Sequence, residues 1–421
     1  MELLWIARTC PYPPTDGERL RVFNLLKGLA GACRITLVYR AMSEQDLAAA
    51  DALRPYCRGG VHAVWVPRPG SLWRRLAWAA PFLLSRHPVS LCTVFFRDIL
   101  AVLRRLTEAQ AYDIVQIEHS SLSIYLDHLP ALRAGARVLT MHNIDYIRFQ
   151  RVRQNTPPGL MRLYHAYNAA RYRAWELAAL ARYDRVMTMS ELDAAQLRRD
   201  GVQVPLDVVP NGVDTETIAC EPPRPGARDV LFVASMDSEA NHDAAVWLAG
   251  RIWPLIRAGS DGLRLLLVGR GPQPALAAFH DGRSVLVTGT VDQVLPYYRD
   301  AAVVVVPLRS GGGTRLKILE AMAAGVPVVS TRIGAEGLAV TDGEHLLLAD
   351  DEPALAAAVQ RVLGDVALQQ RLSAAARALV ETRYGWASIV GTQIAVFTAA
   401  RQTPARPPGG GGAHALERRS A

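Results

Sequence analysis

The stretch AVVVVPLRSGGGTRLKILEAMAAGVPVVST, residues 302–331, decides the fold of the second half of the chain. Its leading run of valines is typical of a strand that is buried on both faces, as the strands of parallel sheets are. Three glycines follow at 311–313, and Thr314 can cap a helix that begins near Arg315. Gly325 marks the expected end of this helix. The stretch therefore predicts a strand, a glycine loop, a helix and a second parallel strand.

The expected start of this helix is also a predicted anion site, because unpaired backbone N–H groups and the helix dipole point at one spot there. Arg315 and Lys317 place two cations where the dipole is already positive, which is unfavourable by roughly 0.3–1 kcal/mol for each. A bound diphosphate would reverse that sign. Only Lys27 and Lys317 are lysines among the 47 basic residues. We predict a phosphate site at Arg315 and Lys317; two cations that extend into water are the alternative.

Glu320 lies one helical turn after Lys317, on a neighbouring face of the expected helix. A carboxylate at this position can accept two hydrogen bonds from the hydroxyl groups of a ribose. The alternative is an ion pair with Lys317 across three residues, and both arrangements can hold at once.

Apolar runs of the same kind recur along the whole chain and alternate with helical stretches. This alternation predicts βαβ units, and hence an α/β protein with one doubly wound parallel sheet in each half. The expected strands are 3–7, 34–40, 61–67, 113–118, 137–143 and 185–190 in the first half, and 230–235, 263–269, 284–289, 302–308, 326–331 and 345–350 in the second.

The length of 421 residues suits two domains of about 200 residues each. We expect a first lobe over 1–209 and, after a linker rich in Pro, Gly and charge at 210–229, a second lobe over 230–383. We expect a helix over 384–400 to pack back towards the first lobe. The Pro- and Gly-rich tail at 401–421 is expected to be disordered.

Charge is distributed unevenly between the two halves. Residues 1–214 hold 27 Lys and Arg against 19 Asp and Glu, whereas the remainder is neutral. A basic first half is typical of a protein that meets phosphate groups, an anionic lipid surface or nucleic acid, and solvated surface charge is the alternative. There is no long apolar run and no signal peptide, so we expect a cytoplasmic protein. The odd number of cysteines without a CxxC pair predicts free thiols at Cys10, Cys33, Cys57, Cys92 and Cys220.

Four motifs occur in order along the chain: VVPNGVD (208–214), LLLVGRGP (265–272), VTGTVDQVLPYYRDAAVVVVPL (287–308) and GGGTRLKILEAMAAGVPVVST (311–331). They resemble those of the retaining glycosyltransferases of family 4, particularly bacterial members associated with exopolysaccharide or surface-glycan assembly. The resemblance covers about residues 1–400. It implies a GT-B fold, in which two Rossmann-like lobes face a central cleft, with the nucleotide sugar on the second lobe and the acceptor on the first.

The resemblance also implies roles for single residues. Glu320 matches the glutamate that binds the nucleotide ribose, and the loop at Thr290–Val291 matches the segment beside the base. Gly17 matches a glycine loop that approaches the donor phosphates. The implied donor-binding residues are Gly17, Val291, Gly312, Gly313, Thr314, Arg315, Lys317 and Glu320.

Two departures from the family pattern stand in the second half. Gly312 occupies the position of a glutamate that often contacts the donor sugar, and residues 234–245 lack the cations that often follow the first strand of this lobe. The diphosphate charge must then be met elsewhere, and Arg315 and Lys317 are the available candidates.

On the acceptor side, one expected strand ends at Glu118 and His119, and the next ends near His142 and Asp145. Polar residues just past the carboxyl ends of parallel strands face the binding crevice. The resemblance implies a catalytic histidine here, and direct alignment puts Glu118 at its position. We favour His119 over Glu118, because a histidine titrates near neutrality and can relay a proton. For His142 we prefer a structural hydrogen bond.

The expected reaction is transfer of a sugar from a nucleoside diphosphate to a glycan or polyprenyl-diphosphate-linked acceptor, with retention and with charge developing on the leaving phosphate. We expect neither a metal nor another cofactor, and no nucleic acid partner. A GT-B-fold epimerase and a catalytically silent nucleotide-sugar-binding partner of a glycan-assembly complex are the alternatives. A dehydrogenase is disfavoured, because GRG at 269–271 lacks the full glycine fingerprint.

Two stretches suggest peripheral contact with the anionic inner face of the plasma membrane. Residues 71–85 combine aromatic side chains with Arg74 and Arg75. Pro81 disfavours a long helix there, and a core helix is preferred over a membrane contact. Residues 147–176 are rich in arginine and suit a lipid-diphosphate acceptor or an anionic membrane.

Overall fold

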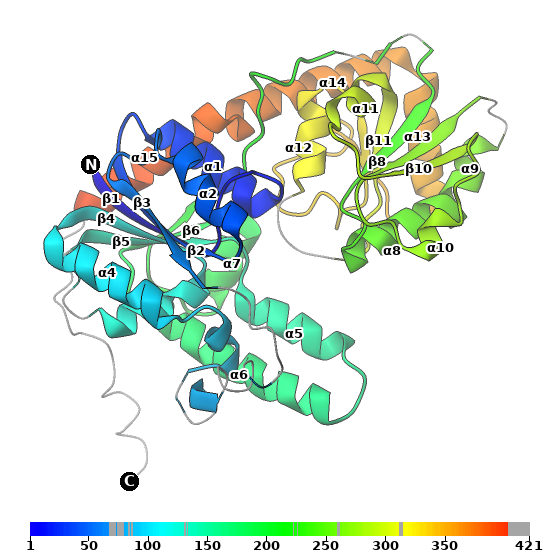
Figure 1. Cartoon of the computed structure of the whole chain (residues 1–421). Helices are drawn as coiled ribbons and strands as arrows, with labels where there is room; N and C mark the ends of the chain where they lie inside the picture. The colour runs from blue at the N-terminus through cyan, green and yellow to red at the C-terminus, as the bar shows by residue number, and fades with distance from the viewer. Residues whose placement is uncertain are drawn as a thin grey trace. The chain divides into compact units, whose positions relative to one another are not determined.

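The computed structural model divides into two compact units, Met1–Val209 with Val390–Ala421, and Pro210–Ile389. Several expectations from the sequence lie outside the residues that it describes: Gly312, Gly313 and Thr314, most of 71–85, and the tail from 403. The structure describes residues 1–66, 73, 80–82, 85, 87–129, 132, 134–221, 223–224, 226–258, 262–310 and 315–402, without the side chains of 151 and 155 (Figure 1).

Within the described residues, the first unit is built on a seven-stranded sheet with every neighbouring pair parallel and the order β3-β2-β1-β4-β5-β6-β7. Five of the six residues of the central strand β1 are buried, as expected for a strand that is covered on both faces. The strands are β1 (Glu2–Ala7), β2 (Arg34–Ala41), β3 (Gly60–Trp65), β4 (Tyr112–Glu118), β5 (Ala134–Met141), β6 (Arg185–Thr188) and β7 (Leu206–Val208).

Helices connect these strands, and short polar side chains begin several of them. Asp16 caps α1, Ser43 and Asp46 form a capping box at α2, and Ser190 caps α7. The helices of this unit are α1 (Gly17–Leu29), α2 (Glu44–Leu53), α4 (Arg97–Ala109), α5 (Asp145–Asn155), α6 (Leu160–Leu180) and α7 (Glu191–Arg199), with 3₁₀ segments η1 (Val89–Thr93) and η2 (Ser120–His128).

The second unit has a six-stranded parallel sheet in its described residues, with the order β10-β9-β8-β11-β12-β13. In this doubly wound order the chain reverses direction across the sheet between β8 and β11, and ligands of such sheets bind at the carboxyl ends of the two strands at this point. The strands are β8 (Asp229–Val233), β9 (Arg264–Val268), β10 (Val285–Gly289), β11 (Ala301–Val306), β12 (Val328–Ser330) and β13 (Leu347–Leu348).

Helices cover both faces of this sheet, with α8 on one side and α12 on the other (Figure 1). Asp351 and Asp365 cap α13 and α14. The helices are α8 (Glu239–Trp247), α9 (Trp253–Arg257), α10 (Pro274–Ala277), α11 (Leu295–Asp300), α12 (Leu316–Ala323), α13 (Glu352–Gly364), α14 (Val366–Leu379) and α15 (Trp386–Gln402), with π-helical turns η3 (Leu248–Ile252) and η4 (Val380–Tyr384).

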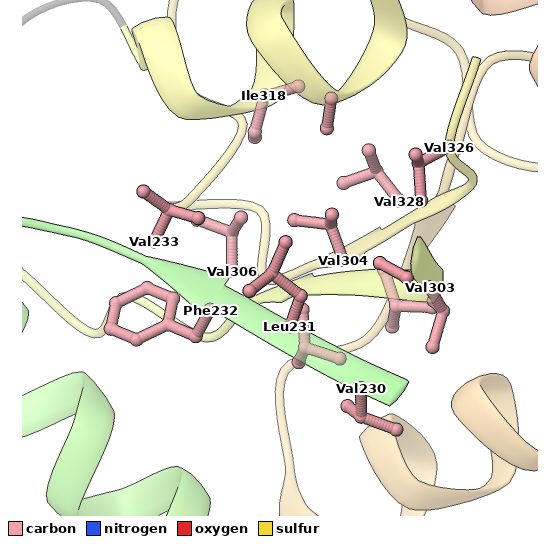
Figure 2. Packing of buried hydrophobic residues seen from close by; sticks show 14 of the residues in the cluster. Val230, Leu231, Phe232, Val233, Val303, Val304, Val306, Ile318, Val326 and Val328 are labelled. Carbon is pink, nitrogen blue, oxygen red and sulfur yellow. The ribbon is translucent and has the colours of Figure 1, made fainter. Parts of the chain in front are cut away.

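The valines that the sequence singled out lie in the core of the second unit. Figure 2 shows Val304 and Val306 of β11 beside Leu231 of β8, with Ile318 of α12 packed over them. All of these side chains are fully buried. The core therefore fixes α12 to the sheet and holds the start of this helix at the carboxyl ends of β8 and β11.

The two parallel α/β sheets confirm the predicted fold class, and each of the twelve expected strands is present. The short edge strand β7 was not predicted, because its three residues lie between Pro205 and Pro210 and give no periodic signal. Helix α12 begins at Leu316, with Arg315 as the residue that precedes it. Gly325 follows the helix in the left-handed conformation that a helix end favours.

The segment between the two expected lobes packs on the second unit. The Val213 amide donates to the Tyr384 carbonyl over 2.7 Å, and Arg377 donates to the Thr215 carbonyl over 2.7 Å. Helix α15 begins in this unit and its later turns belong to the first, where Gln393 donates to Gln116 over 2.9 Å.

Two further expectations can be compared with the described residues. All five cysteines are free thiols, as predicted. None of the described helices is both long enough and apolar enough to cross a membrane.

The close approach of β9 to β8 gives a stability prediction at Gly269. This residue has φ +145°, and a Cβ there would lie 1.7 Å from the Ala234 carbonyl oxygen. We expect Gly269→Ala to destabilise the second unit by about 3 kcal/mol or more, because both the backbone and the contact must be displaced. Calorimetric melting checks this. The control is Gly364→Ala, where a Cβ meets nothing within 4 Å. A Gly269→Ala protein that melts at the wild-type temperature contradicts the prediction.

Candidate functional site

Polar side chains gather at the carboxyl edge of the second sheet, where β8 and β11 end. Lys317 lies in the first turn of α12, and its Nζ donates to Oδ1 of Asn241 over 2.8 Å. Asn241 belongs to α8 and is itself held by a 2.9 Å hydrogen bond from Nδ2 to the Ser235 carbonyl. The Lys317 Nζ also lies 4.8 Å from the centre of the Phe232 ring. The site therefore joins the two helices that follow β8 and β11.

The protonation of Lys317 would change if an anion bound beside it. Burial lowers its pKa to about 7, the charge of Arg315 acts in the same direction, and Glu320 opposes both. A lysine with this pKa is only partly charged at neutral pH, whereas a nearby diphosphate favours the charged ammonium group. The predicted phosphate site is thus occupied by a lysine whose charge depends on what binds beside it.

Arg315 does not extend into water, which was the alternative considered from the sequence. Only 8% of the residue is exposed, and Nη2 donates to the Ile333 carbonyl over 3.3 Å. Ile333 follows β12, so Arg315 links the start of α12 to the loop after the neighbouring strand. A guanidinium group that is fixed in this way adds permanent positive charge beside Lys317.

Glu320 accepts a hydrogen bond from the hydroxyl of Tyr298, with the two oxygens 3.1 Å apart. Burial raises the pKa of Glu320, against the opposing effects of Tyr298 and Lys317. Glu320 and Lys317 form no ion pair within 4.0 Å, although both are described. The carboxylate therefore keeps acceptor capacity for another group, since Tyr298 uses one of its oxygens.

Of four further residues expected to bind the donor, the structure describes only Val291. Val291 follows β10 and packs, half-buried, against the core of the second unit. Gly312, Gly313 and Thr314 lie outside the described residues. Arg315, Lys317 and Glu320 are brought together at one helix.

The structure adds cations that the sequence reasoning missed. Arg270, directly after β9, donates from Nε to the Ser235 hydroxyl over 2.8 Å. Arg309, after β11, binds Asp243 through two hydrogen bonds of 3.0 and 2.5 Å. Residues 234–245 contain no cation, but arginines from the two neighbouring strand ends bind to them. Their positions directly after buried strands were the signal that could have identified them.

In the first unit, Glu118 ends β4 inside a buried network. Its Oε2 lies 2.6 Å from Nε2 of His142, and its Oε1 accepts a 2.6 Å hydrogen bond from Gln116. Although burial acts in the opposite direction, His142 and the fully buried Arg21 lower the pKa of Glu118. Both carboxylate oxygens are therefore engaged, and His142 makes the structural hydrogen bond that we preferred for it.

His119 is the next residue and is held differently. Its φ of +74° is the only positive value among the described residues other than glycine. This conformation is strained for a histidine and is typical of functional sites. The ring stacks on His142 with centroids 4.3 Å apart, and Nε2 lies 3.0 Å from Oε1 of Glu18. His119 thus has a carboxylate partner within ion-pair distance.

The glycine loop after β1 brings this carboxylate to His119. Gly17 is the first residue of α1, and Asp16 caps the helix by accepting from the Arg19 amide. Glu18 follows, with an ion pair to Arg8 in addition to His119. Although burial opposes ionisation, His119 and Arg8 hold the pKa of Glu18 well below its usual range. Gly17 and His119, which were predicted separately, therefore lie at one site.

A pocket of about 270 Å³ opens beside this site, at the carboxyl ends of β1 and β2. Apolar side chains such as Phe96 and Tyr125 line it, together with Arg8, Thr9 and Arg40. The Arg40 guanidinium lies 4.4 Å over the Phe96 ring and donates to the Val66 carbonyl over 2.9 Å. The pocket offers apolar walls and guanidinium groups to a bound molecule.

Family models match the chain in two consecutive parts. Residues 16–217 match the model described as Glycosyltransferase Family 4, and residues 227–365 match the one described as Glycosyl transferases group 1.

Individual proteins are similar over different shares of their length. A 44.6 kDa protein of the cps region of Klebsiella pneumoniae is 21% identical over 83% of this chain and 88% of its own. The phosphatidyl-myo-inositol mannosyltransferase of Mycobacterium leprae is 34% identical over 44% of this chain and 51% of its own length. Among solved structures, Anabaena HepE in complex with UDP-glucose has a TM-score of 0.65 at 12% identity, covering 95% of this chain and 100% of its own.

The two lobes, the helix start at Lys317 and the consecutive family matches lead to the same assignment. The chain belongs to glycosyltransferase family 4, and it is a hexosyltransferase-class enzyme with the GT-B fold.

Proposed function

We propose that this enzyme transfers a hexosyl group from a nucleoside diphosphate sugar to a glycan or polyprenyl-diphosphate-linked acceptor in bacterial surface-polysaccharide synthesis, with retention of anomeric configuration. The observation that carries the proposal is the arrangement at α12. Arg315 is buried, Lys317 has a lowered pKa, and Glu320 can accept a further hydrogen bond. All three lie near the start of α12, where the strand order of the sheet reverses.

In this proposal the diphosphate lies at the start of α12 and binds Lys317 and Arg315. The Nζ of Lys317 already donates to Asn241, and an ammonium group has three protons, so it can bind a phosphate oxygen as well. Glu320 accepts from the ribose hydroxyls, and the loop at Val291 lies beside the base. The UDP-glucose complex of HepE, which shares the fold, supports a donor of this class.

The bond between the anomeric carbon and the leaving phosphate oxygen breaks, and the acceptor oxygen bonds to the same face of the sugar. The acceptor hydroxyl gives its proton to the leaving phosphate, so no strong general base is needed. Lys317, Arg315 and the helix start stabilise the charge that develops on the diphosphate, and we propose that no metal is required. His119, paired with Glu18, hydrogen-bonds a sugar hydroxyl.

The acceptor side of the proposal rests on the first unit. The pocket with apolar walls and two arginines suits an amphipathic molecule with an anionic group. The similarity to a protein of the Klebsiella cps region and to a mannosyltransferase with a lipid acceptor in its name supports a surface-glycan context. We propose action at the cytoplasmic face of the plasma membrane.

The proposed activity is tested with a panel of UDP-, GDP- and ADP-sugars, both alone and with lipid-diphosphate acceptors. We expect transfer from one of them to yield a product with retained configuration, and EDTA to leave the rate unchanged. NMR of the anomeric proton checks the configuration. Interconversion of sugars with donor alone identifies an epimerase instead, and binding without turnover of any donor identifies a silent partner.

The donor site is tested by Lys317→Ala and Glu320→Ala. We expect each to weaken binding of the cognate nucleoside diphosphate by about tenfold to a hundredfold, because each removes a hydrogen bond to a charged group. Titration calorimetry measures the affinity, and circular dichroism checks the fold. The matched control is Lys27→Ala, which removes the other lysine of the chain from an exposed position. Wild-type affinity in either folded variant rejects the site assignment.

Binding is also expected to take up a proton above neutral pH. The pKa of Lys317 is about 7 without ligand, and a diphosphate beside it raises this pKa. Affinity should therefore be insensitive to this group below pH 7 and fall by up to about tenfold per pH unit above it. Calorimetry at pH 8 in buffers of different ionisation enthalpy measures the proton uptake. Lys317→Met should abolish the uptake; an unchanged value in that variant assigns the proton to another group.

A further inference from the structure

We propose that the hairpin of α5 and α6 in the first unit docks on an anionic lipid bilayer. The contact is made by a surface that we call the hairpin tip. Figure 1 shows the two helices side by side, joined by a short turn. This surface would hold the enzyme at the membrane that contains a lipid-linked acceptor, so the inference rests on the proposed function. The hairpin tip consists of Val152, Arg153, Leu160, Met161, Arg162, Leu163, Tyr164 and Tyr167.

Large apolar side chains are exposed at the first turn of α6. Leu160 is 86% exposed, Leu163 68% and Met161 60%. This turn contains no acidic residue and no side chain caps it, since Gly159 precedes the helix. Monomeric soluble proteins rarely expose neighbouring apolar groups of this size, and such patches mark sites of interaction.

The character of α6 changes along its length. Its later turns bury Ala169, Tyr172 and Glu176 against the first unit, whereas its first turns leave Leu160 and Tyr164 exposed. Tyrosine has an apolar ring and a polar hydroxyl, which suits the boundary between lipid and water. The helix is thus anchored at one end and presents an amphipathic surface at the other.

The charge of the hairpin identifies the partner. Residues 146–175 contain six arginines and neither Asp nor Glu. Near the base, Arg148 and Arg173 form ion pairs with Asp145 and Asp200. At the tip, the exposed Arg153 and Arg162 form no ion pair with any residue that the structure describes. Exposed apolar groups beside unpaired arginines fit anionic lipid headgroups, whereas a second copy of this surface would bring like charges together.

The base of the hairpin is connected to the candidate acceptor site. Glu176 of α6 accepts a 2.9 Å hydrogen bond from the Tyr146 amide at the start of α5, and it also accepts from the Ser120 hydroxyl. Ser120 follows His119 directly. Tyr172 adds a 3.1 Å hydrogen bond to Asp145. A bilayer bound at the tip would therefore be held at a fixed position relative to His119.

Vesicle flotation of the full chain tests the proposal. We expect wild-type protein to float with phosphatidylcholine vesicles that contain phosphatidylglycerol, and not with pure phosphatidylcholine. Leu160→Ser/Leu163→Ser should reduce the bound fraction about tenfold or more, because two large apolar side chains no longer enter the bilayer. Arg153→Gln/Arg162→Gln should weaken binding about fivefold per arginine, and added salt should do the same.

Matched controls come from the same unit. Leu192→Ser removes another exposed leucine, and Arg54→Gln/Arg198→Gln removes two exposed arginines, all outside the hairpin. These variants should float like wild type. The proposal is overturned if the Leu160/Leu163 variant floats as well as the wild-type protein. It is also overturned if the wild-type protein binds vesicles equally well with and without phosphatidylglycerol. A dimer that the leucine variant abolishes assigns the tip to a second copy. Nucleoside diphosphate affinity should stay unchanged in the tip variants, so failure here is separable from failure of the donor site.

Discussion

Parallel pairing of strands that are buried on both faces is the constraint on which the rest of each unit depends. A strand such as β11, with every residue buried, has no room for a charged group along its length. Polar side chains must therefore collect where the strands end, and parallel pairing puts those ends at one edge of the sheet. Lys317 and Asn241 in the second unit, and Glu118 and His119 in the first, lie at such edges for the same reason.

The charged side chains are arranged differently at the carboxyl edges of the two sheets. In the second unit, Arg315 and Lys317 crowd positive charge at a helix start, and burial leaves Lys317 poised to gain a proton when an anion arrives. In the first unit, the carboxylates already have cationic neighbours, since Glu18 pairs with Arg8 and Glu118 interacts electrostatically with the buried Arg21. The first arrangement suits the binding of a diphosphate. The second suits hydrogen bonding to a neutral sugar, because its charges are balanced before any ligand binds.

The hairpin of α5 and α6 has a base held by buried hydrogen bonds and a tip on the outside of the first unit. Burial raises the pKa of Glu176 to about 8. This side chain accepts hydrogen bonds from backbone amides at the start of α5 and from Ser120, and so fixes the base of the hairpin. The tip exposes apolar and basic groups that no part of the described chain covers. A fixed base with an exposed tip of this composition is the arrangement on which the proposed membrane contact rests.

The sequence by itself determined every described strand except β7, and the helix that Gly325 follows, because these depend on local periodicity and turn chemistry. It also predicted the residues of α12 that are proposed to bind the donor. It did not reveal that Lys317 meets Asn241, 76 residues away, or that Glu18 meets His119. It also left Arg315 open between a bound phosphate and water, and the structure buries this residue against the loop after β12. Those contacts depend on the order in which strands pair. That order brings distant strand ends together, and a local pattern records only the period of an element and never its neighbour.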